Sequence, residues 1–152
     1  MRRGLAIYRE QRNWLLPNLE GALAEAEAGA GETDAGLRRL DDALAELEVA
    51  ENRWYEAEMH RIRAEILRKR DPANTAAAEQ SLQAAIAIAQ SQKARSFKLR
   101  AALSLAKLYR AANREPDAHA VLATVEGFPP TQQFPELTEA QTLLSALSEA
   151  MR

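Results

Sequence analysis

The sequence of 152 residues contains no cysteine. This absence excludes a disulfide framework, thiolate zinc and iron–sulfur sites and a cysteine nucleophile. Residues that favour strands are scarce too, since valine and isoleucine together number 8 and threonine 6. Alanine (32) and leucine (20) instead make up a third of the chain. Both residues have high helix propensity, so the composition predicts an all-α protein.

The chain also lacks a charge excess and a long apolar run. Lys and Arg number 20 against 22 Asp and Glu, which gives a net charge of −2. This balance excludes charge-driven disorder and disfavours nucleic acid as a partner. No segment reaches the roughly 18 apolar residues of a membrane span, and the apolar run at residues 5–8 is too short for a signal peptide. We expect a cytoplasmic protein with no membrane partner.

Breaks in the helical periodicity divide the chain into about eight helices. Turn-forming segments lie at Ala28–Asp34, Asp71–Thr75, Asn113–Asp117 and Gly127–Pro135. Pro17 fits the first turn of a helix and argues against a helix that runs through it. Apolar residues at helical spacing between the breaks predict helices at 2–12, 14–29, 34–50, 53–69, 75–91, 95–112, 116–125 and 135–149.

Small residues recur along these helices with a period of about 41 residues. Gly36, Ala78 and Ala118 are 42 and 40 apart, and each is followed four residues later by leucine. A second set, Ala24, Ala64 and Ala106, is spaced by 40 and 42. Small residues allow the two helices of a hairpin to approach closely, and stacked hairpins bury a continuous core. Two helices per period is the tetratricopeptide pattern, with a period longer than the standard 34 residues.

The sequence also resembles one group of tetratricopeptide arrays. The resemblance lies in the runs RWYEAEMHRIRAEIL, AAAEQSLQAAIAIAQSQKARSFKLRAALSLAKLYR and AHAVLATVEGF, and in the ending FPELTEAQTLLSAL. Such arrays close large bacterial signalling proteins, in which a class III adenylate or guanylate cyclase domain and a STAND/AAA-type ATPase usually come first. The resemblance covers about residues 4–147. It implies a C-terminal repeat region, and hence a fragment of a longer chain.

We therefore expect one domain, a right-handed tetratricopeptide-like α-solenoid. Three hairpins would occupy residues 14–50, 53–91 and 95–126. A half-repeat would precede them, and a capping helix at 135–149 would follow. Trp14, Trp54 and Tyr55 are interpreted as packing between hairpins rather than stacking on a ligand. Phe128 and Phe134 are interpreted as covering the last hairpin, which would otherwise expose apolar surface.

Residues suited to catalysis are sparse. His60 and His119 have no further ligand at metal-binding spacing, and no nucleophile lies beside a base. The GxxxxGK[ST] phosphate-binding motif is absent from the sequence. We expect a protein that is not an enzyme and has no cofactor and no metal.

The repeat register instead suggests a binding groove. In tetratricopeptide arrays the first helix of each hairpin lines the concave surface. Five cations fall at such positions: Arg61, Arg68, Arg100, Lys107 and Arg110. The other groove positions include Gly21, Glu25, Glu58, Glu65 and Leu103. Arginine recognises carboxylates well, so the groove is predicted to bind an acidic or C-terminal segment of a partner protein.

Two alternatives to this groove remain. Glu58 and Glu65 lie on the same face and can neutralise two of the cations, which would leave only a solvated charged face. The exposed side of the first helix, with Leu5 and Tyr8, offers self-association as a second function. The expected function is a scaffold or protein-interaction module in signal transduction, and homodimerisation is the alternative.

Overall fold

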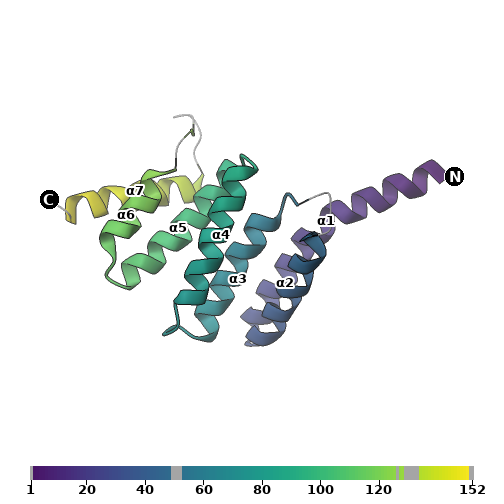
Figure 1. Ribbon diagram of the computed structural model, residues 1–152, viewed down its shortest axis with the longest axis horizontal. Coiled ribbons are helices and arrows are strands. Elements are labelled where there is room, and N and C mark those ends of the chain that lie inside the picture. The colour runs from purple at the N-terminus through teal and green to yellow at the C-terminus, as the bar shows by residue number, and fades with distance from the viewer. Residues whose placement is uncertain (1, 49–52, 126, 129–133, 151–152) are drawn as a thin grey trace.

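The computed structural model describes residues 2–48, 53–125, 127–128 and 134–150, with side chains from residue 16 onward. Seven α-helices and no strand make up these residues (Figure 1). Each helix packs on the next in the chain. The helices are α1 (Arg2–Gly29), α2 (Thr33–Glu48), α3 (Glu56–Arg70), α4 (Ala76–Ser91), α5 (Arg95–Ala111), α6 (Glu115–Ala123) and α7 (Pro135–Ala150).

The odd-numbered helices form one row of the array. In addition to the contacts between consecutive helices, α1 contacts α3, α3 contacts α5 and α5 contacts α7. The even-numbered helices make no such contacts with one another in the part of the chain that is described. The odd helices therefore lie closer together, and their row is the inner side of the curve. The arrangement is consistent with an α-solenoid whose concave surface is built by α1, α3, α5 and α7.

The N-terminal helices differ from the prediction. The expected break between helices 2–12 and 14–29 is wrong, because α1 is a single helix with Pro17 inside it, and the total is seven helices rather than eight. Pro17 is buried on the same face of α1 as Gly21, Ala24 and Ala28. Packing of this face outweighs the roughly 3 kcal/mol that an interior proline costs a helix. The side chains of Leu5, Tyr8 and Trp14 lie outside the described residues.

The small residues of the repeat lie where helices approach closely, as predicted. Ala24, Ala64 and Ala106 are fully buried, and so are Ala78 and Ala118. Gly36 of α2 has no room for a side chain, because a Cβ there would lie 2.7 Å from the backbone oxygen of Ala24 in α1. Glycine is required at this position, where the later hairpins have alanine, because the Gly36 backbone lies so close to the backbone of Ala24.

Three of the turns between helices share one backbone geometry. Gly31, Lys93 and Asn113 have positive φ angles of 95°, 56° and 57°. The N–H of the residue after each of them donates to a carbonyl five residues earlier, at 2.8–2.9 Å. This is the Schellman motif, which satisfies the free carbonyls at a helix end and reverses the chain within a few residues. The sequence predicts two of these turns through Gly31 and Asn113, and it gives little sign of the third.

Aromatic residues fill the seams between hairpins. The ring of Tyr55 stands edge-on to Phe97 of α5 with centroids 5.8 Å apart, and Trp54 lies 5.0 Å from Tyr55. Phe128 and Phe134 form a second edge-to-face pair at 5.4 Å and pack on the core beside the last hairpin. The predicted packing roles of Trp54, Tyr55, Phe128 and Phe134 are therefore confirmed.

The closing helix α7 has one apolar and one polar face. Ala140, Leu143 and Leu147 are buried against the last hairpin. Gln141, Ser145 and Glu149 on the outer side are exposed. This is the expected arrangement of a capping helix. None of the described helices is long and apolar enough to cross a membrane.

His60 gives the array a predicted pH dependence. It is half-buried on α3, and its charged neighbours are Glu56, Arg63, Arg53 and Asp41 of α2. Burial, the largest effect, lowers the pKa of His60. The unfolded chain then binds more protons than the folded one, so the free energy of unfolding is expected to fall as pH drops below about 6.5. Urea unfolding of His60→Gln between pH 7.5 and 5 should show a smaller loss than wild type.

His119→Gln is the matched control, because it removes the other histidine. His119 lies on α6, and its Nε2 is 3.1 Å from Ser148 Oγ of α7. A pH slope that disappears in His119→Gln and persists in His60→Gln contradicts the assignment to His60.

Candidate peptide-binding groove

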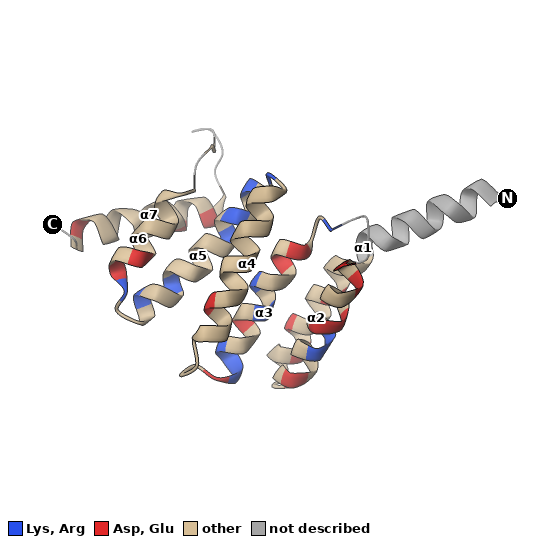
Figure 2. Cartoon of the chain, in the orientation of Figure 1, with Lys and Arg blue, Asp and Glu red and all other residues tan. Residues whose placement is uncertain are grey.

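The five predicted cations lie on two neighbouring helices of the inner row. Arg61 and Arg68 come from α3, and Arg100, Lys107 and Arg110 come from α5. In Figure 2, blue segments (Lys, Arg) lie on α5, both blue and red segments lie on α3, and red segments (Asp, Glu) predominate on the described part of α1 and on α2. The structure brings four of these cations together in two separate places, Arg61 with Arg100 and Lys107 with Arg110, and Arg68 lies in neither.

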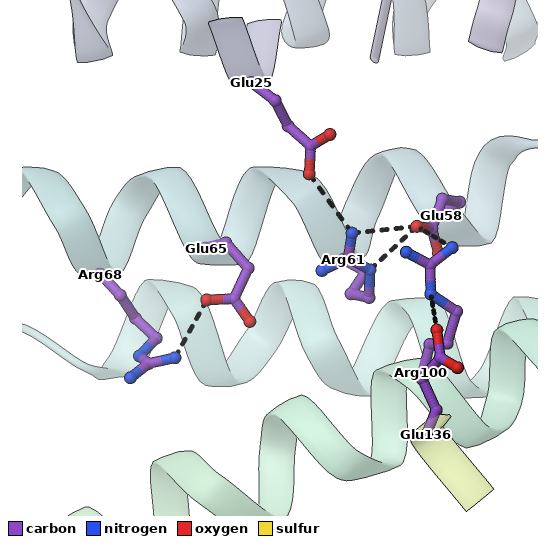
Figure 3. Close-up of polar contacts among 7 residues, drawn as sticks. All are labelled: Glu25, Glu58, Arg61, Glu65, Arg68, Arg100 and Glu136. Carbon is purple, nitrogen blue, oxygen red and sulfur yellow. Dashed lines mark hydrogen bonds and ion pairs between the residues drawn. The ribbon is translucent and has the colours of Figure 1, made fainter. Parts of the chain in front are cut away.

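The first place is a buried carboxylate, Glu58, which is only 1% exposed. Its Oε1 accepts hydrogen bonds from Arg61 Nε at 3.0 Å and forms an ion pair with Arg100 Nη1 at 2.7 Å. Its Oε2 is buried without a hydrogen-bond partner among the described residues. Figure 3 shows both guanidinium groups turned toward this one carboxylate. Glu58 therefore forms ion pairs with two of the predicted groove cations at once.

Carboxylates from the first and last helices of the inner row, α1 and α7, extend this cluster (Figure 3). Glu25 of α1 lies 3.4 Å from Arg61 Nη2, and Glu136 of α7 lies 3.7 Å from Arg100 Nε. We call Glu25, Glu58, Arg61, Arg100 and Glu136 the Glu58 network. It links all four helices of the inner row. Burial opposes the charge of Arg61, but the hydrogen bond and attraction from Glu58 outweigh burial and raise the pKa of the guanidinium.

The other three cations differ in how they are paired. Arg68 forms an ion pair with Glu65, one turn earlier on α3, at 3.0 Å. Lys107 pairs with Glu139 of α7 at 2.6 Å. Arg110 is exposed and has no ion-pair partner among the described residues. Four of the five cations thus already have a carboxylate beside them.

Sequence reasoning identified Glu58 and Glu65 as opposing charges but missed Glu136 and Glu139. Both lie on the closing helix, which contacts α5 in the same way that α5 contacts α3. A spacing of 40–42 residues places the counterparts of Arg100 and Leu103 at residues 140–145, so the repeat register gives no signal for Glu136 and Glu139. Two further groove predictions are wrong: Gly21 and Leu103 are buried. Gly21 lies under Ile62 and Tyr55, whose atoms would be 3.0 and 3.1 Å from a Cβ.

The second place is a hollow of about 700 Å³ between α5 and α7, which we call the α5–α7 hollow. Lys107 and Arg110 stand on its α5 wall. The α7 side combines apolar and hydroxyl groups with one carboxylate: Phe134, Pro135, Thr138, Glu139, Thr142, Leu143 and Ala146. Two cations beside apolar walls can hold a segment that carries both a carboxylate and an apolar side chain.

A second hollow of about 590 Å³ lies between α4 and α6 on the other side of the array. Its polar groups are already paired with one another. Tyr109 Oη donates to Glu79 at 2.9 Å, and Arg114 binds the same carboxylate at 2.8 Å while it covers the Tyr109 ring at 4.2 Å. Since this polar cluster is internally satisfied, the α5–α7 hollow is the better candidate for a ligand.

In the described residues, no group of three or more histidine, aspartate or glutamate side chains is placed to hold a metal ion. Comparison with known proteins finds no match, since no protein-family model, curated protein or solved structure is similar to this chain. The candidate site therefore rests on the geometry of the groove alone.

Proposed function

We propose that this chain is a non-enzymatic protein-interaction module of the tetratricopeptide class, and that it binds a segment of a partner protein in the α5–α7 hollow. The observation that carries the proposal is the pairing of Lys107 and Arg110 with apolar walls in one open hollow on the inner row of helices. The bound segment is acidic or ends in a carboxylate, with an apolar side chain next to it.

The state of each ion pair explains why binding is assigned to this end of the groove. A ligand carboxylate must compete with the acidic partners of the cations. The Lys107–Glu139 pair is about half exposed on both sides, and exposed pairs contribute only about 0–1 kcal/mol. Arg61 and Arg100 are bound to the buried Glu58, whose release would leave a charge unpaired in the interior. A ligand carboxylate can therefore replace Glu139 beside Lys107 and can bind Arg110, but it cannot replace Glu58 beside Arg61 and Arg100.

The non-enzymatic assignment is supported by the residues that line the hollow. Among the described lining residues there is no histidine, cysteine or serine. His60 lies on α3 with Asp41 of α2 among its charged neighbours, and His119 contacts Ser148, so neither histidine provides a base there. The charged groups of the hollow suit recognition of a carboxylate.

The resemblance noted in the sequence supports a further proposal about context. The chain would be the C-terminal repeat region of a cyclase-linked signalling ATPase, and it would carry contacts between that protein and its partners in the bacterial cytoplasm. Sequencing the gene upstream of the part that encodes this segment tests this context. An open reading frame that encodes no cyclase or ATPase domain there contradicts it and leaves the groove proposal unaffected.

A charge reversal tests the groove. In Lys107→Glu with Arg110→Glu, the affinity for acidic peptides with a free C-terminus is expected to fall at least about tenfold, equivalent to about 1.4 kcal/mol. Fluorescence anisotropy with a labelled acidic peptide library, and with the same peptides amidated at the C-terminus, measures the change. Wild-type binding should also weaken between 0.1 and 1 M salt, because the hollow is open to solvent.

Arg38→Glu with Lys93→Glu is the matched control, because it makes the same charge change on exposed residues outside the groove. Its affinities should stay within about twofold of wild type. If the groove variant binds every peptide as tightly as wild type at low salt, the α5–α7 hollow is not the binding site.

A further inference from the structure

The α5–α7 hollow contains a carboxylate of its own, Glu139. Lys107 and Arg110 are the cations of the hollow, and Glu139 is the one acidic group among its described lining residues. Glu139 Oε1 lies 2.6 Å from Lys107 Nζ, whereas Arg110 has no ion-pair partner in the described part of the chain. A ligand that enters the hollow therefore meets an anion as well as two cations.

The Lys107–Glu139 pair is not what holds α7 on the array. The two side chains are 45% and 51% exposed, and exposed pairs contribute little to stability. The helix is held instead by Ala140, Leu143 and Leu147, which are buried against the last hairpin. Glu139 can therefore be replaced without loss of the fold, and its effect on a ligand can be measured separately.

A ligand carboxylate is both attracted and repelled in this hollow. Lys107 and Arg110 attract it, but Glu139 lies at ion-pair distance from the same Lys107, so the two carboxylates come close together. Like charges that are brought together across an interface disfavour a partner. Each further acidic residue of a ligand adds to this repulsion. Glu139 therefore opposes the binding of a purely acidic segment.

A basic side chain on the ligand removes this repulsion. Its ammonium or guanidinium group can pair with Glu139 while the ligand carboxylate takes the place of Glu139 beside Lys107. Arg110 lies three residues after Lys107 on the same face of α5, so it can bind the same ligand carboxylate. Each charged group then has a partner of opposite sign. The charges of the hollow therefore fit a segment in which a carboxylate and a basic side chain lie close together.

We propose that Glu139 makes the α5–α7 hollow specific for a partner segment of mixed charge. The segment presents its carboxylate to Lys107 and Arg110 and a basic side chain to Glu139. Its apolar side chain packs on the wall that includes Phe134 and Leu143. Glu139 supplies the repulsion that discriminates against other acidic segments, which attraction alone does not provide. This inference rests on the proposed function, because it concerns a ligand bound in the same hollow.

Fluorescence anisotropy with three sets of labelled peptides tests this specificity. Every peptide ends in leucine with a free carboxylate, and the sets carry lysine, glutamine or glutamate at each of the four preceding positions in turn. At the best position, wild type is expected to bind the lysine peptide about three- to fivefold more tightly than the glutamine peptide, as one exposed ion pair allows, and the glutamate peptide most weakly. In Glu139→Gln the preference for lysine should disappear, and the glutamate peptide should bind at least as tightly as the lysine peptide.

Glu149→Gln is the matched control, because it removes the same charge from the exposed outer side of the same helix, outside the lining of the hollow. It should keep the wild-type order of affinities. Circular dichroism should show the same helix content in both variants and in wild type. A preference for lysine that persists unchanged in Glu139→Gln, or a wild-type protein that prefers the glutamate peptide to the lysine peptide, overturns the inference.

The charge reversal Lys107→Glu with Arg110→Glu separates this inference from the proposed function. If that variant loses binding while wild type and Glu139→Gln rank the three kinds of peptide alike, the hollow is the binding site but Glu139 does not set its specificity. If the variant binds every peptide as wild type does, or if wild type binds none of them, the proposed function fails and this inference fails with it.

Discussion

Replacing Glu58 with glutamine is expected to lower the free energy of unfolding by about 2–4 kcal/mol, measured by urea unfolding. Glu58 is buried and binds both Arg61 and Arg100 through one oxygen. Glutamine keeps the shape of the side chain but removes the charge that compensates these two guanidinium groups. Arg61 is only 12% exposed, so water cannot take over the role of the carboxylate.

Glu65→Gln is the matched control for this change. Glu65 lies on the same helix and also pairs with an arginine three residues later, but both side chains of that pair are more than a third exposed. The control is expected to lose less than about 1 kcal/mol, as exposed pairs do. Equal losses in the two variants would show that the Glu58 network does not hold the inner row together.

Gly36→Ala is expected to destabilise the protein by about 1–3 kcal/mol, although alanine is the better helix former. Helix propensity alone favours the substitution by about 1 kcal/mol. The new Cβ, however, would lie 2.7 Å from the carbonyl oxygen of Ala24, and a backbone oxygen in a packed helix cannot move away without shifting α1. The clash therefore outweighs the gain in propensity. Ala78→Leu should cost at least as much, since Ala78 is 0% exposed.

Gly29→Ala gives the reference for the glycine substitution. Gly29 ends α1, and a Cβ there would meet nothing within 4 Å. Thermal unfolding should show this variant close to wild type and Gly36→Ala well below it. If Gly36→Ala is as stable as wild type, α1 and α2 do not approach as closely as the repeat of small residues implies.

Most helix ends could be predicted because turn-forming residues lie next to them in the sequence. The expected helices at 75–91 and 135–149 agree with α4 and α7 within one residue at each end. The failure at Pro17 has the opposite cause. A local rule predicted a helix boundary there, but burial of Pro17 with Gly21 and Ala24 keeps α1 continuous. No residue pattern near Pro17 in the sequence indicates that its side chain is buried.

The candidate site was predictable only in part, because residue spacing indicates neither burial nor contacts with the closing helix. The repeat register placed Arg61 and Arg100 on the same side of the array, and both meet at Glu58. It did not reveal that Glu58 is buried, or that Glu139 of the closing helix reaches Lys107. Those facts depend on how tightly the inner row curves. The hollow beside Lys107 and Arg110 arises from the same curvature, so it could not be read from residue spacing.

The pattern of helix contacts has a consequence for how the chain folds. In the described structure, every helix contacts only helices one or two places away in the chain. The loops that close during folding are therefore short, which favours rapid formation from any hairpin. No contact ties one end of the array to the other, so the ends can open while the middle stays folded. Amide hydrogen exchange should be slowest in α3, α4 and α5, which have neighbours on both sides, and should quicken toward α7.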